Sequence, residues 1–369
     1  MAMFDTDVFV MGGGPAGLAT AIAARRQGFT VTLSDADRPP VDKACGEGLM
    51  PDSLAAATQL NIHVPADAGI PFRGIRFAGP DHSVAALFPH GEGRGVRRTV
   101  LHSLLVETAA SAGVRLLWGA SVAGIEDHSV HMNSSSVTAR WIVGADGGHS
   151  LLRRWAGLSE IRGESQRFGF RRHYRTAPWS EYVEIHWGDG CQFYITPVAA
   201  DEVCVVLMSR DPHLRIAHAL PRFPSLYARL AACPASTPER GSFAAARRLR
   251  RITSGHIALV GDASGTVDAI TGEGLCLAFR QSVALAAALR SNDLRLYEGA
   301  HTGLSRRPLW MANLMLTMDR WPGLRQRALR TLSARPELFA GLLAAHIGQA
   351  SLAGLATTAA TLGWEIATA

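Results

Sequence analysis

Short apolar runs alternate with glycine-rich turns at both ends of this sequence. Residues 8–11 form an apolar run typical of a buried strand, and residues 18–26 are rich in alanine, which favours a helix. A second apolar run, at residues 29–33, leads to Asp35. The order strand, turn, helix, strand predicts one structural unit at the N-terminus.

The same apolar pattern returns later in the chain. Ile142 and Val143 precede Gly-Ala-Asp-Gly, and residues 257–260 precede Gly-Asp, so both runs are predicted to be buried strands. An apolar stretch from Leu275 predicts a helix soon after the second of them. These segments are expected to join the N-terminal unit in one discontinuous domain.

Alternating polar and apolar residues occupy the regions between these segments. With the turns that interrupt it, this alternation predicts an antiparallel sheet. Its expected strands are residues 75–77, 84–88, 168–174, 183–187, 191–196 and 203–208. A hairpin tip is expected at residues 134–136, and one or two helices are expected within the alanine- and leucine-rich residues 337–369.

The first glycine-rich turn has the spacing of a dinucleotide-binding site. Gly12 permits a tight turn, Gly14 lets the backbone approach a pyrophosphate, and Gly17 lets the helix pack closely on the strand. The N-terminus of the helix that follows directs free N–H groups and a positive dipole end toward phosphates. This turn therefore predicts a bound dinucleotide.

Acidic residues follow two of the predicted strands. Asp35 lies about 20 residues after the first glycine, the spacing expected of an acid that binds ribose hydroxyls, and Asp37 is the competing candidate. The Asp262 carboxylate can accept hydrogen bonds from ribityl or ribose hydroxyls. Gly272 and Gly274 precede a helix whose N-terminus would face the edge of a flavin ring. Two such units that close on one dinucleotide indicate a flavoprotein.

The motifs GGGPAG, GADGGHS and GDASG, with GEGL after the last, resemble those of the p-hydroxybenzoate hydroxylase-like FAD-dependent oxidoreductases over roughly residues 5–300. That superfamily includes aromatic monooxygenases, ubiquinone-pathway hydroxylases, halogenases and geranylgeranyl reductases. The resemblance implies FAD as cofactor and NAD(P)H as electron donor, with Asp35 at the adenosine ribose, Arg98 at a phosphate or ribose, and Asp262 on the ribose-pyrophosphate side. The full set of expected FAD-binding residues is Gly12, Gly14, Pro15, Ala16, Gly17, Asp35, Ala36, Arg98, Val122, Asp146, Gly261, Asp262, Gly272, Gly274 and Leu275.

The expected fold class is α/β: a Rossmann-like FAD-binding domain, an inserted antiparallel β-sheet substrate domain and C-terminal helices. The FAD-binding domain is expected at residues 1–70, 96–160 and 250–300. The substrate domain is expected at residues 71–95 and 161–249, where its sheet would cover the flavin, and the helical segment at residues 301–369.

Several residues are candidates for the chemistry. The resemblance places the loop that contains Cys45 and Glu47 near the flavin, and Cys45 has the alternative of being a small buried residue. On the sheet, His173, His186 and Tyr194 are candidates for a base that deprotonates a phenol, with a purely structural role as the alternative for each.

Two function classes follow from the resemblance. The favoured hypothesis is an NAD(P)H-dependent monooxygenase that hydroxylates or epoxidises an aromatic or polyketide-like small molecule through a flavin C4a-hydroperoxide. The alternative is a reductase of carbon–carbon double bonds in an isoprenoid or other lipid, which the KACGEGL and TGEGL stretches favour. Halogenation ranks third, because residues 193–197 lack the tryptophans of the halogenase WxWxIP motif.

The composition fits an enzyme with a sizeable core, since 47% of the 369 residues are hydrophobic and 18% are charged. The net charge of +6 comes almost wholly from arginine, because Lys43 is the sole lysine. Arg247–Arg251 is the one basic run, and a solvated face or an interface is its expected setting. We therefore expect a small-molecule substrate, aromatic or lipid-like, and no nucleic-acid partner.

The five cysteines form no CxxC pair and no metal-binding spacing with histidine, so no metal site is expected. They are Cys45, Cys191, Cys204, Cys233 and Cys276. Their odd number, without a signal peptide, predicts a reduced, cytoplasmic protein. A monomer or a homodimer is expected. No integral membrane segment is expected, and peripheral contact by residues 337–369 is the alternative for the tail.

Overall fold

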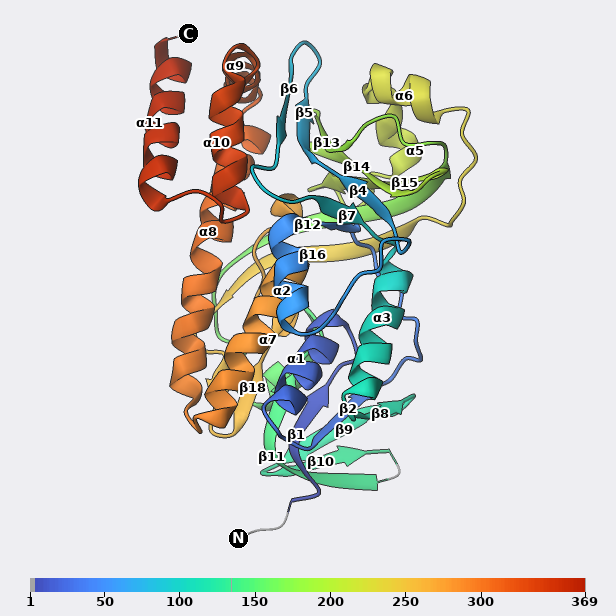
Figure 1. The fold of residues 1–369 in the computed structure, drawn as a ribbon, viewed down its shortest axis with the longest axis vertical. Coiled ribbons are helices and arrows are strands. Elements are labelled where there is room, and N and C mark those ends of the chain that lie inside the picture. Colours follow the sequence, from blue (N-terminus) through green and yellow to red (C-terminus); the bar gives the residue numbers. More distant parts are fainter. Residues whose placement is uncertain (1–3, 134, 369) are drawn as a thin grey trace.

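A computed structural model describes residues 4–133 and 135–368 of the chain. Figure 1 shows two main layers of structure, with the N-terminal sheet and its helices at one end and a second sheet, flanked by the C-terminal helices, at the other. This arrangement confirms the predicted α/β fold with an inserted sheet and C-terminal helices. The exact domain boundaries stay a prediction, and helix α8 (Leu294–Arg320) crosses the one expected at residue 300.

Within the described residues, the first sheet has eight strands, and its central strands are parallel. Its order is β17 (Thr253–Ser254), β18 (Ile257–Leu259), β11 (Ser135–Gly144), β1 (Thr6–Met11), β2 (Val31–Asp35) and β8 (Arg115–Trp118), with β10 (Ser129–Met132) and β9 (Val122–Glu126) paired beyond β11. Val10 in β1 lies opposite Leu33 in β2 and Val143 in β11. The strands predicted near residues 8, 31, 142 and 257 are therefore neighbours, and their carboxyl ends meet at one edge. Of the expected hairpin tip, Ser135 and Ser136 belong to β11, whereas residue 134 lies outside the described residues.

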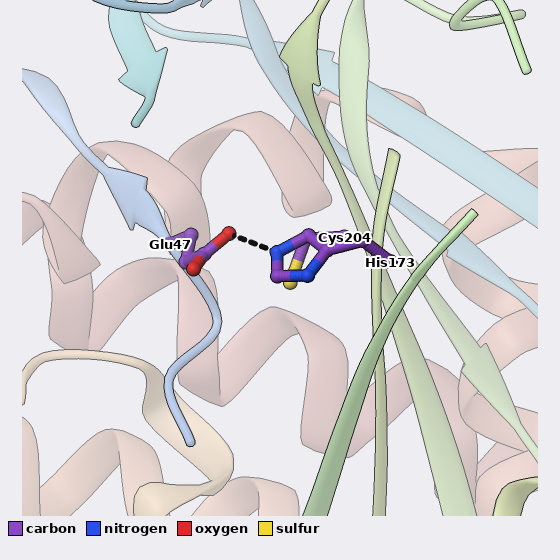
Figure 2. Close-up of side chains that lie close together, drawn as sticks. All are labelled: Glu47, His173 and Cys204. Atoms are coloured by element: carbon purple, nitrogen blue, oxygen red, sulfur yellow. Dashed lines mark hydrogen bonds and ion pairs between the residues drawn. The ribbon is translucent and has the colours of Figure 1, made fainter. Parts of the chain in front are cut away.

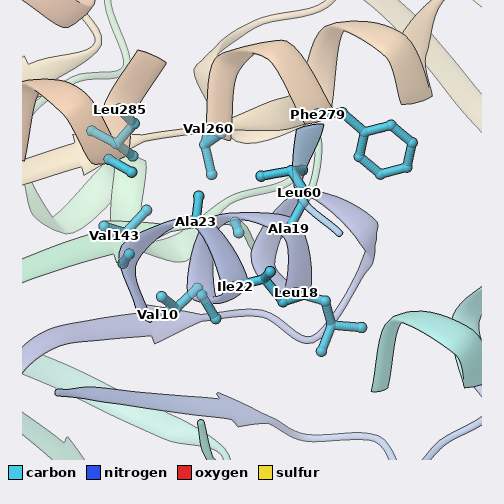
Figure 3. Packing of buried hydrophobic residues seen from close by; sticks show 14 of the residues in the cluster. Val10, Leu18, Ala19, Ile22, Ala23, Leu60, Val143, Val260, Phe279 and Leu285 are labelled. Atoms are coloured by element: carbon cyan, nitrogen blue, oxygen red, sulfur yellow. The ribbon is translucent and has the colours of Figure 1, made fainter. Parts of the chain in front are cut away.

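Helix α1 (Pro15–Arg26) lies between this sheet and helix α7 (Gly274–Arg290), as Figure 3 shows. Leu18 and Ile22 on α1 are buried in the same cluster as Val10, and Phe279 of α7 packs in that cluster too. Close approach depends on small residues, because a Cβ atom on Gly17 would lie 1.8 Å from the Gly12 carbonyl oxygen. The packing holds the first glycine turn beside the start of α7.

The second sheet has seven strands in the part of the chain that the structure describes. Its order is β16 (Arg240–Leu249), β12 (Ile161–Arg175), β15 (Glu202–Ser209), β14 (Cys191–Ala199), β13 (Tyr182–Trp187), β5 (Gly74–Ala78) and β6 (Ser83–Leu87). All neighbouring strands are antiparallel, as predicted, except β13 and β5, which run parallel. This pair joins two distant segments of the chain, so no hairpin dictates its direction. Strand β16 was not predicted. The basic run Arg247–Arg251 begins within this strand, and the backbone there pairs with β12.

A small third sheet connects the two layers. It consists of β3 (Gly48–Leu49), β7 (Gly93–Gly95) and β4 (Ile70–Phe72). The remaining helices near the sheets are α2 (Pro51–Gln59), α3 (Arg98–Ser111), α4 (Leu151–Trp155), α5 (Ile216–Ala219) and α6 (Pro224–Leu230). Because β3 follows the Cys45–Glu47 loop directly, this sheet helps to hold that loop between the two larger sheets.

The C-terminal helices cover β5, β6 and β13, as Figure 1 shows. They are α8, α9 (Pro322–Ala334), α10 (Pro336–His346) and α11 (Leu352–Thr368). Proline begins both α9 and α10, where its missing N–H costs no helical hydrogen bond, so Pro322 and Pro336 divide the segment into separate helices. None of the helices over the described ranges combines the length and the low polarity that crossing a membrane requires.

Candidate functional site

One cavity of about 880 Å³ extends from the glycine turns of the first sheet to the C-terminal helices. Its wall includes Gly12 and Asp35 at one end and Leu343 and Ile366 at the other. Within the described part of the chain, every residue expected to bind FAD lines this cavity except Gly17. Gly17 instead packs α1 against the first turn, as the third glycine of the spacing requires.

Asp35 closes the first turn from the end of β2. Its carboxylate accepts hydrogen bonds from the N–H groups of Gly13 and Asp37, and both acidic residues lie on the cavity wall. A Cβ atom on Gly12, whose φ is +111°, would lie 2.4 Å from the Ala145 carbonyl oxygen. The turn therefore tolerates only glycine at this position, and the backbone is brought close to the cavity.

The polar groups at this end of the cavity fit FAD. The N-terminus of α1 has Gly14 as its N-cap and receives no side-chain hydrogen bond, so its first N–H groups are free to bind a pyrophosphate. On the same wall, Arg98 Nε and Asp146 Oδ1 are buried without a hydrogen-bond partner among the described residues. An unpaired donor and an unpaired acceptor beside a helix N-terminus match the phosphates and hydroxyls of a dinucleotide. Asp262 is half-exposed and bonds to Lys43 Nζ at 3.1 Å.

The loop that precedes β3 is fixed by Glu47. The Glu47 side chain is fully buried, and its Oε1 accepts hydrogen bonds from the Arg98 N–H at 2.9 Å and from Arg171 Nη1 at 3.0 Å. Its Oε2 lies 2.7 Å from His173 Nε2, the contact drawn in Figure 2. The carboxylate is thus fully engaged by the substrate sheet and by the start of α3.

Glu47, His173 and Cys204 lie close together in Figure 2, and their ligand atoms are within 4.8 Å of one another. A metal ion would have to compete with the Arg171 guanidinium, which already supplies the positive charge beside Glu47. Burial raises the pKa of the Cys204 thiol, which disfavours the thiolate that a metal needs. We interpret the cluster as an anchor for the loop rather than as a metal site.

The candidate catalytic residues separate into two groups. Cys45 and Tyr194 line the cavity, as does Glu47 despite its engaged carboxylate. His173 and His186 are not part of the described cavity wall, since the first contacts Glu47 and the second contacts Glu184 at 2.9 Å. The hypothesis that either histidine is a catalytic base therefore has no support from its position.

Tyr194 is also poorly suited to act as a base. Its hydroxyl donates a hydrogen bond to the Ile270 carbonyl at 2.7 Å, and burial raises the pKa of Tyr194. Cys45 is partly buried, and its Sγ accepts a hydrogen bond from the Glu47 N–H at 3.4 Å. Among the residues that the sequence suggested, Cys45 is thus the one whose reactive atom stays free to face a substrate.

The far end of the cavity is an apolar chamber that the sequence did not predict. Ile75, Phe77 and Ile185 form its floor on the substrate sheet. The C-terminal helices provide the rest of its wall, including Met311, Met315 and Met318 of α8, Leu332 of α9, Leu343 of α10 and Leu362 of α11. The methionine spacing of i, i+4 and i+7 on α8 was the available signal, but such a stripe also occurs on ordinary core helices.

The comparisons with known proteins agree with this site. Residues 5–196 match the model of a family described as FAD binding domain. Menaquinone reductase of Mycobacterium tuberculosis (strain CDC 1551 / Oshkosh) is 28% identical over an alignment of 324 residues, and the match covers 79% of this chain and 78% of the relative. Rifampicin monooxygenase of Streptomyces venezuelae is 28% identical over an alignment of 166 residues, and the match covers 42% of this chain and 34% of the relative.

The fold has close counterparts among solved structures. A flavoprotein/dehydrogenase from Cytophaga hutchinsonii superposes with a TM-score of 0.81 at 17% sequence identity. The superposition covers 93% of this chain and 92% of the chain of that protein. The family match includes the first glycine turn, the Glu47 loop and the Asp146 motif, and it spans more than half of the chain. The chain therefore belongs to the FAD binding domain family, within the p-hydroxybenzoate hydroxylase-like superfamily of FAD-dependent oxidoreductases.

Proposed function

We propose that this FAD-dependent oxidoreductase uses NAD(P)H to reduce a carbon–carbon double bond in an isoprenoid or another lipid. The observation that carries the proposal is the apolar chamber, which is continuous with the FAD end of the cavity. A long hydrocarbon chain can bury its surface against Met315, Leu332 and Leu343, at about 0.8 kcal/mol for each buried methylene. The similarity to menaquinone reductase over most of the chain supports the same choice.

The residues of this chain would position the reactants. Bound FAD would supply the hydride. The N-terminus of α1 and Arg98 would hold the pyrophosphate, and Asp35 would bind the adenosine ribose. The ion pairs of Glu47 keep the Cys45 loop against the substrate sheet, and the apolar chamber excludes water from the double bond.

The second candidate is the oxygen-dependent monooxygenase acting on an aromatic small molecule. The similarity to rifampicin monooxygenase favours it, although that similarity extends over less than half of this chain. An aromatic substrate with a long alkyl chain would also suit the chamber. The requirement for oxygen separates the two candidates, because a monooxygenase cannot form product without it.

The test uses FAD-loaded enzyme under anaerobic conditions, with NADH or NADPH and an isoprenoid quinone as probe. We expect a product that is two hydrogen atoms heavier in its side chain, formed without oxygen. Met315→Trp should abolish this product by filling the chamber while FAD stays bound, and the exposed Asn313→Trp on the same helix is the matched control. A product that appears only in air, with one added oxygen atom, would overturn the proposal in favour of the second candidate.

A further inference from the structure

We propose that Glu273 and His346 form the proton source of this reaction, with His346 donating to the substrate and Glu273 supplying His346. The inference rests on the proposed reduction of a double bond, which needs a proton as well as a hydride. Neither residue belonged to the expected catalytic set. The two come from segments far apart in the sequence, the start of α7 and the end of α10.

The geometry places His346 at the cavity and Glu273 beside it. His346 is 8% exposed and lines the cavity wall, next to Thr271 and Gly272, which line it too. Its Nδ1 lies 3.7 Å from Glu273 Oε2. Both atoms are buried, and neither makes a hydrogen bond to any described residue. Two facing polar atoms without partners are rare in a folded interior, and they indicate a functional or solvent-linked role.

Burial keeps both side chains neutral. It raises the pKa of Glu273 to about 8, and the nearby Asp52 on α2 adds to the rise, against Arg280 of α7 and Arg307 of α8. Burial also lowers the pKa of His346 to about 4, an effect that Arg307 strengthens and that Asp52 and a hydrogen bond to the Thr271 backbone oppose. Near pH 7 the pair therefore consists of a carboxylic acid and a neutral imidazole.

Asp52 is itself held by other groups. Its Oδ2 accepts a hydrogen bond from Arg280 at 3.2 Å and from the Cys276 thiol at 3.1 Å. Burial is the main cause that raises the pKa of the Cys276 thiol, and the charge of Asp52 adds to the rise. Cys276 therefore remains protonated. The negative charge of Asp52 is thus kept near Glu273 and favours its protonated form.

These protonation states allow a balanced reduction. Bound FAD would supply the hydride to one carbon of the double bond, and the electron pair of the broken π bond would take the proton of His346 Nε2. The carboxylic proton of Glu273 moves to His346 Nδ1, which leaves a neutral imidazole in its other tautomer and a Glu273 carboxylate. Solvent then returns a proton to Glu273. The substrate would thus gain two hydrogen atoms, one as the hydride and one as the proton of His346.

The other acidic groups at the cavity are less suitable. The Glu47 carboxylate is engaged by Arg171 and His173, and the Tyr194 hydroxyl has no second group beside it among the described residues that would supply a proton, unlike His346 with Glu273. The Cys45 thiol is the real competitor, because it too lines the cavity. The experiment must therefore separate Cys45 from His346.

The first measurement does not depend on substrate. Difference infrared spectroscopy of FAD-loaded protein at pH 7 should show the carbonyl stretch of a protonated carboxyl group that Glu273→Gln removes and Glu47→Gln leaves in place. The same absorption should disappear from the wild type as the pH rises through about 8. A spectrum in which Glu273→Gln changes nothing would overturn the inference, whatever the substrate proves to be.

The second measurement separates proton donation from the earlier steps. His346→Gln should reduce product formation by about 10²-fold or more, the usual contribution of a general acid, while NAD(P)H still reduces the flavin at the wild-type rate. Glu273→Gln should remove the loss of rate that accompanies its titration above about pH 8. If Cys45→Ala abolishes product and His346→Gln retains it, Cys45 is the donor and the inference is wrong. A product that requires oxygen would overturn both proposals, whereas the infrared result bears on this pair alone.

Discussion

The tetrapeptide Gly-Glu-Gly-Leu occurs twice in this chain, at residues 46–49 and 272–275, and its glutamate has opposite surroundings in the two places. Both glutamates are buried. Glu47 faces Arg171 and His173 and makes short contacts with each. Glu273 faces His346 at 3.7 Å, and burial raises its pKa to about 8. The same local sequence therefore provides a paired carboxylate in one region and a protonated acid in the other.

The backbone differs as well. Glu47 itself has a positive φ of 59°, which is rare for a residue with a side chain. In the second copy Gly272 takes the positive φ, at 71°, and Glu273 has an ordinary φ of −90°. The charged hydrogen bonds of Glu47 offset the cost of its conformation. Tertiary partners thus decide both the ionisation and the backbone shape of one short motif.

The comparison predicts unequal effects for one substitution made at both sites. Glu47→Gln removes the charge that balances buried Arg171, and it should lower the free energy of unfolding at pH 7 by about 3–5 kcal/mol. Glu273→Gln exchanges one neutral group for another of the same shape, so its effect at pH 7 should be much smaller. Urea denaturation of the two variants gives both values.

A surface pair provides the control. Glu160→Gln breaks the contact with Arg250, in which both side chains are more than half exposed, and it should leave stability almost unchanged. Equal losses from Glu47→Gln and Glu273→Gln would contradict the contrast between the two sites.

The dependence of stability on pH sharpens the same contrast. Glu273 titrates near 4.5 in an unfolded chain and near 8 in the folded protein, so the folded state holds an extra proton between these values. The free energy of unfolding must then fall as the pH rises. The pKa of His346 is lowered from 6.5 to about 4, so its titration raises the free energy of unfolding as the pH rises toward 6.5. Above pH 6.5, Glu273 is the member of the pair that still changes the free energy of unfolding.

We therefore expect Glu273 to contribute a fall of about 2 kcal/mol between pH 6.5 and 8, at roughly 1.4 kcal/mol per pH unit. Denaturation at a series of pH values should show this fall in the wild type and in His346→Gln, but not in Glu273→Gln. Identical pH profiles for wild type and Glu273→Gln would show that Glu273 is ionised when folded.

The smallest expected effect concerns the glycines that precede the two glutamates. Gly272→Ala places a side chain in the left-handed region and should cost about 1–2 kcal/mol of stability. Gly46→Ala meets no atom within 4 Å and has no positive φ, so it should be nearly neutral. Thermal melts of the two alanine variants compare them directly, and a larger loss for Gly46→Ala would contradict the difference in backbone shape.

The FAD end of the site was the more predictable part of the molecule. Gly12, Gly14 and Asp35 act through backbone geometry and neighbouring turns, which are local properties that spacing reveals. The β13–β5 pairing and strand β16 were missed because they join segments that are distant in the chain. Residues 240–249 also lack the polar–apolar alternation that marks a strand.

The sequence by itself determined the α/β fold, the order of the glycine turns and the identity of the cofactor. Those features depend on short-range patterns, namely the glycine spacings and the apolar runs beside them. The tertiary structure alone decided that four C-terminal helices close an apolar chamber, that Arg171 reaches Glu47, and that His346 meets Glu273. Arg171 and His173, which face Glu47, and His346, which faces Glu273, are each more than 70 positions away, and the local sequence of the two Gly-Glu-Gly-Leu segments is identical. Their different chemistry is therefore a property of the fold.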